Sequence, residues 1–182
     1  MFHLRVADGE DLPALRALID RSVRELSRAY YSPDQIASAL VHVFGIDTQL
    51  LTDRSYYVVE VAGEIVAAGG WSSRRSLFGG DQHKAAEDPE LDPARDPARI
   101  RAFFVDPAWT RRGLARLLFN ACSAAALIRG FSALELAATL PGEPLYRALG
   151  FRSVEAFEVA MPDGQRLPLV RMARALEPAV DG

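Results

Sequence analysis

The sequence predicts a single α/β domain in which helices flank a mixed β-sheet. Helical and strand periods of apolar residues alternate along the chain, an apolar strand over residues 99–105 leads into a long apolar helix, and another strand follows that helix. Such a strand, helix and strand form a parallel pair with a right-handed crossover. With 182 residues and 49% hydrophobic residues, residues 1–176 can bury one sizeable core.

The first elements are a short strand and two helices. Residues 2–6 are expected to form the strand. Asp8 then precedes a run with apolar residues on one side, and its side chain can cap that helix. Ser32 and Gln35 form a capping box with proline between them, which predicts the start of the second helix.

A hairpin and a long polar segment follow. Residues 55–61 and 64–71 are β-rich runs separated by Ala62-Gly63, which predicts two antiparallel strands. Residues 76–98 lose all periodicity and contain paired glycines, acidic residues and prolines. A loop of this length is either disordered or functional, for example as a lid, and we expect disorder or contact with a partner.

The strand over residues 99–105 shows a regular alternation, with Ile100, Ala102 and Phe104 expected on one face. The long helix begins beyond Gly113, and the next strand is expected over residues 132–138. Ligands of parallel units collect at the carboxyl ends of the strands, where residues 106–113 lie.

The chain ends with a short helix and a second hairpin. The helix is expected over residues 143–149, and the strands over residues 151–161 and 166–173, joined by the turn at residues 162–164. These elements bring the expected total to about seven strands and four helices. Residues 177–182 are expected to form a frayed tail.

Composition disfavours several classes of protein. The net charge of -3 argues against nucleic acid as the main partner. The one cysteine, Cys122, cannot form an internal disulfide and is expected to be a buried core thiol. Apolar runs are short and broken by charge, so we expect no membrane association and a cytoplasmic location. No metal is expected either.

The turn at residues 110–116 is suited to hold phosphate. The first backbone amides of a helix have no partner within it and lie at the positive end of its dipole. Gly113 lets a ligand approach this helix start closely. Arg111, Arg112 and Arg116 can reach phosphate oxygens with their side chains.

Two motifs carry a resemblance to a known family. The segment Thr110-Arg111-Arg112-Gly113-Leu114-Ala115 resembles the acyl-CoA pyrophosphate loop of the GNAT superfamily of N-acetyltransferases. Tyr146, followed four residues later by Gly150-Phe151, resembles the second signature of that family. The two motifs occur in the family's order, in elements that match its fold. The resemblance implies a sheet that splays between its fourth and fifth strands and acetyl-CoA as the acyl donor.

The resemblance also implies roles for individual residues. The backbone amide of Phe103 would face the thioester carbonyl, Val105 would face the pantetheine arm, and Tyr146 would place a hydroxyl near the sulfur. Thr110 stands where the family usually has Gln or Arg, and Thr139 where many members have an asparagine. The further positions implied to contact acetyl-CoA are Phe104, Thr110, Arg111, Arg112, Gly113, Leu114, Ala115, Arg116 and Thr139.

The general base and the acceptor site are less defined. Arg99 stands where some members of the family have a glutamate that deprotonates the amine. Glu135 on the neighbouring strand is therefore a candidate general base that acts through a water. The amine can instead lose its proton to solvent. The acceptor is expected between the first two helices and the last hairpin. Candidate lining residues are Arg24, Tyr30, Tyr31, Trp71, Ser72 and Phe157.

We therefore expect an enzyme that transfers an acetyl group from acetyl-CoA to a primary amine of a small molecule or peptide, through a ternary complex. A non-catalytic CoA-binding sensor or interaction module of the same fold is the first alternative. The second is a nucleic-acid module that uses Arg111, Arg112 and Arg116 on backbone phosphates. The sequence is compatible with a homodimer as well as with a monomer.

Overall fold

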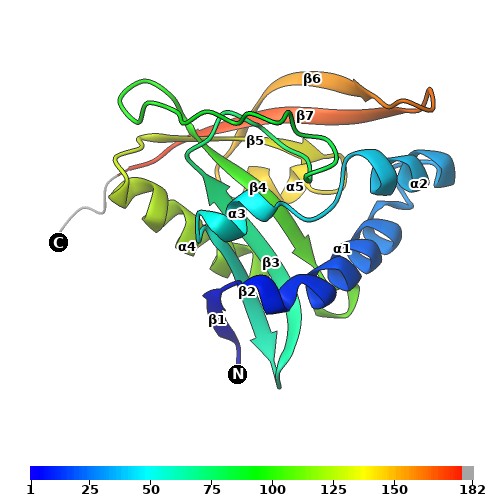
Figure 1. The fold of residues 1–182 in the computed structure, drawn as a ribbon, viewed down its shortest axis with the longest axis horizontal. Helices are drawn as coiled ribbons and strands as arrows, with labels where there is room; N and C mark the ends of the chain where they lie inside the picture. The colour runs from blue at the N-terminus through cyan, green and yellow to red at the C-terminus, as the bar shows by residue number, and fades with distance from the viewer. Residues whose placement is uncertain (178–182) are drawn as a thin grey trace.

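Seven strands form one mixed sheet in the computed structural model, which describes residues 1–177. The strand order is β1-β2-β3-β4-β5-β7-β6; β4 and β5 run parallel and the other neighbours run antiparallel (Figure 1). The predicted mixed sheet is confirmed. Its strands are β1 (His3–Val6), β2 (Tyr56–Val61), β3 (Glu64–Ser72), β4 (Ala98–Val105), β5 (Ala133–Thr139), β6 (Arg152–Ala160) and β7 (Arg166–Ala175). Of the predicted tail, residues 178–182 lie outside the described residues.

The described residues form five α-helices rather than the four predicted. They are α1 (Leu12–Ser27), α2 (Pro33–His42), α3 (Thr48–Thr52), α4 (Leu114–Ile128) and α5 (Glu143–Ala148). The additional helix is α3, which has five residues and is too short to show an apolar period. Asp47 precedes it without capping it, because the Asp47 carboxylate is bound by Arg101 and Lys84.

Local signals identified the capping residues before the first two helices. Ser32 and Gln35 exchange side-chain hydrogen bonds with each other's backbone amides, as in a capping box. Asp8 forms the same arrangement with Asp11. It caps a short 3₁₀ turn that runs directly into α1, so the helix proper begins four residues after the cap.

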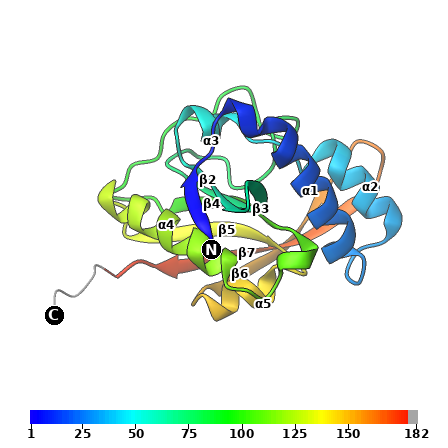
Figure 2. The ribbon, with the colours of Figure 1, turned by 90° about the horizontal axis from the view of Figure 1, so that it is seen from below.

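The sheet is covered by helices on both faces. One apolar core lies between the sheet and α1, α2 and α3, and includes Leu18, Ala39 and Leu50. Two further clusters lie on the opposite face beneath α4 and α5, and include Leu118 and Tyr146. Figure 2 shows α1, α2 and α3 on one side of the sheet and α5 on the other.

Cys122 lies in the core beneath α4. Its side chain is fully buried, as predicted, and burial raises the pKa of its thiol well above the ordinary value. No helix within residues 1–177 is long and apolar enough to cross a membrane.

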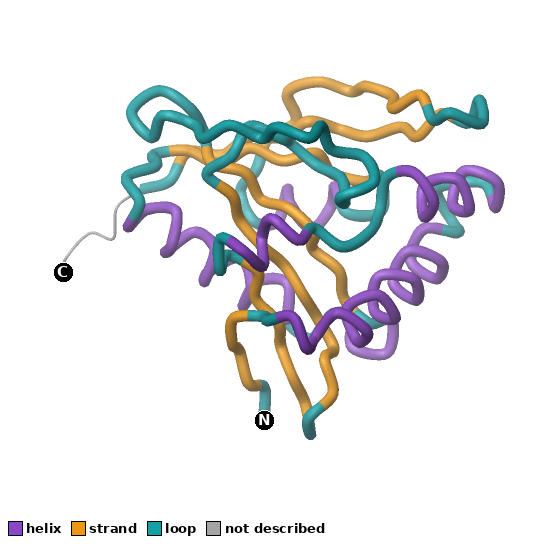
Figure 3. Tube along the Cα trace, viewed as in Figure 1, coloured by secondary structure: helices purple, strands orange, loops and turns teal. Residues whose placement is uncertain are grey.

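The connection between β3 and β4 contains residues 76–97, which we call the strap (Figure 3). In this structure the strap packs against the rest of the domain. Its Gly80 amide donates to the carbonyl of Val43 and its Asp81 amide to that of Ile46, both at 2.8 Å. These anchors come from residues more than thirty positions away, so local composition did not reveal them.

Candidate active site

β4 and β5 diverge after a short paired stretch. Their parallel ladder joins Ala98 with Leu134 and Arg99 with Glu135. Beyond these pairs β5 continues its antiparallel ladder with β7 as far as Thr139. The carboxyl ends of two adjacent parallel strands therefore separate at the edge where α/β sheets bind ligands. The expected splay between the fourth and fifth strands is confirmed.

β4 carries a bulge where it leaves β5. Arg101 pairs with Gly70 of β3 and Phe104 pairs with Ala68. Ala102 and Phe103 together therefore lie opposite Gly69 alone. The Phe103 ring occupies the space beside Gly69, where an added Cβ would lie 2.7 Å from the ring. A glycine at this position lets the aromatic ring lie flat against β3.

The bulge corrects the regular alternation predicted for this strand. Ala102 has φ 56°, which alanine seldom adopts, and the Tyr56 hydroxyl donates to its carbonyl at 3.3 Å. As a result Ala102 and Phe104 contact the core beneath α1 and α2, whereas Ile100 and Phe103 contact the opposite core beneath α4 and α5, so Ile100 does not share a face with Ala102 and Phe104 as predicted. The alternation of side chains along β4 thus shifts at the bulge that contains Ala102 and Phe103.

The turn before α4 presents unused backbone donors. Gly113 adopts φ 81° at the N-cap of α4, and open space surrounds the place where its Cβ would be. Within the described chain, the backbone amides of residues 111–116 donate no hydrogen bond, and the first helical bond runs from Leu117 to Gly113 at 3.0 Å. Both features suit close approach by an anion.

The arginines of this turn carry positive charge that neighbouring acids do not neutralise. Among the described residues, Arg111, Arg112 and Arg116 form no ion pair. The Arg112 guanidinium lies over the Trp109 ring, 4.6 Å from its centroid, which holds the side chain beside the turn. The Thr110 hydroxyl donates to the Pro107 carbonyl at 3.1 Å, so this side chain stabilises the turn itself.

Tyr146 of α5 lies at the opposite side of the split. Its ring meets the Phe103 and Phe151 rings edge to face, with centroids 6.3 Å and 5.8 Å away. Burial raises the pKa of its phenol above the ordinary value. Among the described residues its hydroxyl has no hydrogen-bond partner. The group is therefore neutral at physiological pH and retains a proton to donate.

The two polar candidates on β5 are already engaged. The Glu135 carboxylate accepts from Arg99 through one oxygen and from Arg171 through the other, each at 2.6 Å. The Thr139 hydroxyl accepts from the Gly142 amide at 3.1 Å and so supports the entry to α5. This geometry disfavours Glu135 as a base, because both oxygens are bound by cations.

The structure does not gather the six acceptor candidates into one site. Trp71 packs against Phe131 beneath α4, and the Ser72 hydroxyl accepts from the Arg74 amide. Both side chains are buried.

The other four acceptor candidates lie on the face of α1 and α2. Tyr31 is buried; its hydroxyl donates to the Pro168 carbonyl at 2.7 Å and accepts from the Leu140 amide, and burial raises its pKa to about 12. Tyr31 thus joins the α1–α2 connection to β7. Arg24 pairs with Asp20, Tyr30 is exposed, and Phe157 packs against Phe78 of the strap.

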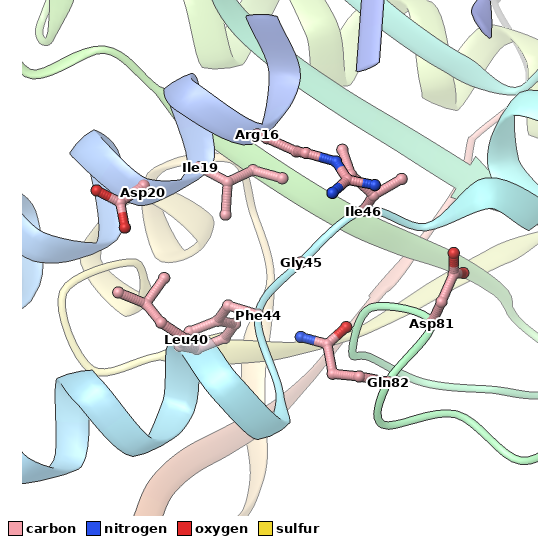
Figure 4. A pocket seen from close by; sticks show the side chains of 9 residues that line it. All are labelled: Arg16, Ile19, Asp20, Leu40, Phe44, Gly45, Ile46, Asp81 and Gln82. Atoms are coloured by element: carbon pink, nitrogen blue, oxygen red, sulfur yellow. The ribbon is translucent and has the colours of Figure 1, made fainter. Parts of the chain in front are cut away.

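A pocket on the same face was not predicted. It has a volume of about 380 Å³ and lies between α1, the end of α2 and the strap (Figure 4). Its lining residues are Arg16, Ile19, Asp20, Leu40, Phe44, Gly45, Ile46, Asp81 and Gln82. The Phe44 ring packs edge to face against the Phe104 ring of β4, with their centroids 6.4 Å apart. This contact connects the pocket to the bulged strand. No sequence signal could reveal a site built from three separate segments.

A family model described as "Acetyltransferase (GNAT) family" matches residues 20–151, which is more than half of the chain. The chain belongs to the GNAT family. It is accordingly an N-acetyltransferase that uses acetyl-CoA. The family assignment favours the enzyme over the sensor and nucleic-acid alternatives. No curated protein matches this chain.

Solved structures share the GNAT fold at low sequence identity. A GCN5-related N-acetyltransferase from Rhodopseudomonas palustris has a TM-score of 0.70 and 19% identity, over 96% of this chain and 95% of that chain. The ribosomal-protein-S18-alanine N-acetyltransferase from Escherichia coli has a TM-score of 0.60 and 18% identity, over 100% and 98%. YncA, a putative acetyltransferase from Salmonella typhimurium solved with acetyl-CoA, has a TM-score of 0.63 and 18% identity, over 100% and 98%.

Proposed function

We propose that this GNAT enzyme transfers the acetyl group to a primary amine of a small molecule or peptide by direct attack within a ternary complex. The observation that carries the proposal is the row of backbone amides at residues 111–116 that donate to no group within residues 1–177, beside the split between β4 and β5. The amides can hold the pyrophosphate while the split admits the pantetheine arm and the acetyl group.

The residues around the split fit acetyl-CoA. Arg111 and Arg116 can pair with phosphate oxygens because no acid competes for them within the described residues. Val105 lies at the end of β4, where the backbone can bond the pantetheine amides. Leu114 and Ala115 contribute backbone amides, whereas Phe104 contributes backbone only, since its ring packs toward Phe44.

Acetyl-CoA supplies an electrophilic thioester carbon; a new carbon–nitrogen bond forms and the carbon–sulfur bond breaks. Negative charge develops on the carbonyl oxygen during this exchange. The Phe103 amide, at the bulge, is the donor that can stabilise this charge. One such fixed donor typically contributes ~3 kcal/mol to the transition state.

Tyr146 is positioned to protonate the departing thiolate. Its raised pKa keeps the phenol protonated, and its hydroxyl is not bound elsewhere in the described chain. We leave Glu135 out of the mechanism because Arg99 and Arg171 occupy its oxygens. The acceptor ammonium loses one proton to water before the attack. The attacking nitrogen loses a second proton to water as the amide forms, which balances the proton that Tyr146 gives to the thiolate.

We further propose that the acceptor enters through the pocket between α1 and the strap. Arg16 lines it and has no ion pair among the described residues, while Ile19, Leu40 and Phe44 provide apolar surface. An amine that also carries a carboxylate and a small apolar side chain fits this lining. Of the six predicted candidates, this keeps Arg24, whose partner Asp20 also lines the pocket.

A panel of primary amines, half of them with a carboxylate, tests the proposal by measuring the release of free CoA. We expect turnover with carboxylate-bearing amines, and a rise of about tenfold in their KM in Arg16→Ala. Arg28→Ala is the matched control, because Arg28 is exposed at the end of α1 and outside the pocket. Tight binding of acetyl-CoA without release from any amine would contradict the proposed reaction.

A further inference from the structure

A buried cluster of four charges joins β4 to the strap. The Arg101 guanidinium donates to Asp47 at 3.1 Å and to Asp88 of the strap at 2.9 Å, and Lys84 of the strap also contacts Asp47. The exposed fractions of the side chains are 1% for Arg101 and Asp47, 7% for Lys84 and 9% for Asp88. Two cations and two anions thus balance within the core.

The cluster lies directly beside the bulge of β4. Arg101 is the last residue of β4 that pairs before the bulge, Ala102 has the unfavourable φ of 56°, and Phe103 follows. A residue held in such a conformation returns to an ordinary one unless its neighbours prevent it. Tyr56 holds Ala102 from one side through its hydroxyl, and the cluster holds Arg101 from the other.

Stability alone does not account for this arrangement. Burial of two ion pairs has a large desolvation cost, and well-packed apolar residues of similar volume are often as stable or more so. Moreover, the Nε atom of Arg101 is buried without a hydrogen-bond partner among the described residues. Two carboxylates from separate segments do, however, fix the direction of one guanidinium and hence of its backbone.

We propose that Arg101 is a positioning residue for acetyl transfer: Asp47 and the strap residue Asp88 hold its guanidinium, and this holds the bulge that aims the Phe103 amide at the thioester carbonyl. The inference rests on the proposed function, in which that amide stabilises the developing charge. It gives the strap a part in the reaction through Asp88, which contacts Arg101.

The decisive variant is Asp88→Asn, which removes one charge from the cluster and leaves Arg101 and the bulge residues in place. Asp53→Asn is the matched control. Asp53 pairs with Arg74, next to the strap, at 2.7 Å, so its loss also loosens an anchor of this region but does not break a contact of Arg101.

The first measurement is the infrared frequency of an isotope-labelled acetyl carbonyl in bound acetyl-CoA. A hydrogen bond from the Phe103 amide lowers this frequency relative to that of acetyl-CoA free in water. The measurement needs no amine substrate. We expect the downshift in the wild type and in Asp53→Asn, and its loss in Asp88→Asn. The dissociation constant of acetyl-CoA, from calorimetry, is expected to stay within about twofold in both variants, because the pyrophosphate turn is untouched.

The second measurement is turnover with any amine that the wild type accepts. We expect kcat to fall by about tenfold to a hundredfold in Asp88→Asn and to change little in Asp53→Asn. Arg101→Lys, which keeps the charge and one of the two contacts, is expected to retain more activity than Arg101→Met. If Asp88→Asn does not fold, Tyr56→Phe removes one hydroxyl from the same bulge and carries the same expectation.

The outcomes separate the two proposals. Equal downshift and equal kcat in Asp88→Asn and Asp53→Asn would overturn the positioning role alone. A parallel loss of kcat and of acetyl-CoA affinity would show a general collapse of the site and would also overturn it. Failure of the wild type to bind acetyl-CoA, or binding with no downshift, would overturn the proposed function on which the inference rests.

Discussion

The Tyr146 ring lies edge to face against the Phe103 ring, with their centroids 6.3 Å apart and an interplanar angle of 64°. Phe103 belongs to β4 and Tyr146 to α5, so this contact joins the two sides of the split. The residue proposed to donate a proton and the residue whose amide is proposed to face the carbonyl therefore contact each other.

Tyr146→Phe should separate chemistry from packing. The variant keeps the ring contacts and removes the hydroxyl, so we expect kcat to fall by about a hundredfold while the affinity for acetyl-CoA stays the same. Steady-state kinetics and calorimetry measure the two quantities. Equal losses in both would make Tyr146 a packing residue instead.

Gly113→Glu should block acetyl-CoA binding. The substitution places a carboxylate in the open space beside the amides of α4, where it repels phosphate, and we expect a loss of affinity of about a hundredfold. Gly164→Glu is the control, since Gly164 has φ 88° and equally open surroundings in the turn between β6 and β7. Unchanged affinity in Gly113→Glu would remove the pyrophosphate assignment.

Glu135→Gln should affect stability more than turnover. The amide can no longer pair with Arg99 and Arg171, which we expect to cost about 1–3 kcal/mol of unfolding free energy in urea titrations. The pH dependence of kcat/KM should match that of the wild type. Loss of a limb from that profile would instead identify Glu135 as the base.

Gly80→Ala should loosen the strap. The added Cβ would lie 2.8 Å from the backbone carbonyl carbon of Gly45, and backbone cannot move aside as a side chain can. We expect a loss of about 1–3 kcal/mol and faster proteolysis within the strap. Gly9→Ala, where no atom lies within 4 Å of the added Cβ, should change neither.

Asp11→Asn should remove part of the acid sensitivity of the fold. The hydrogen bond from Arg5 holds the pKa of Asp11 below its ordinary value. Because the folded-state pKa is the lower one, the stabilisation is complete above about pH 4 and is lost as pH falls through the folded pKa. We expect the melting temperature of the variant to be lower at pH 7 and to decline less between about pH 5 and pH 2. Glu10→Gln, in the same turn and exposed, should follow the wild type.

Features set by neighbours in sequence were predictable, and features set by distant partners were not. The capping box of Ser32 and Gln35 depends on residues three apart, and the expected seven-stranded sheet followed from local periods and the resemblance. The bulge at Ala102 depends on Tyr56 and on the charges around Arg101, which lie on other segments.

The candidate site divides in the same way. The turn around Gly113 could be located from residue order because its amides belong to one helix start. Two other features depend on the order of the strands across the sheet. They are the ion pair between Glu135 and Arg171 and the burial of Trp71 on the face away from the expected acceptor. An arginine within the apolar strand at position 101 was the one local sign of the buried charge cluster.

The burial of Cys122 simplifies the measurements proposed above. The chain has one cysteine, and its side chain is enclosed beneath α4 with a pKa raised by that enclosure. An aromatic disulfide reagent releases a coloured thiolate when it reacts with an accessible thiol, so the folded enzyme itself should produce no colour with it. Such a reagent can therefore detect the free CoA released during turnover, even at high enzyme concentration. Colour that develops without substrate would report unfolding of the enzyme.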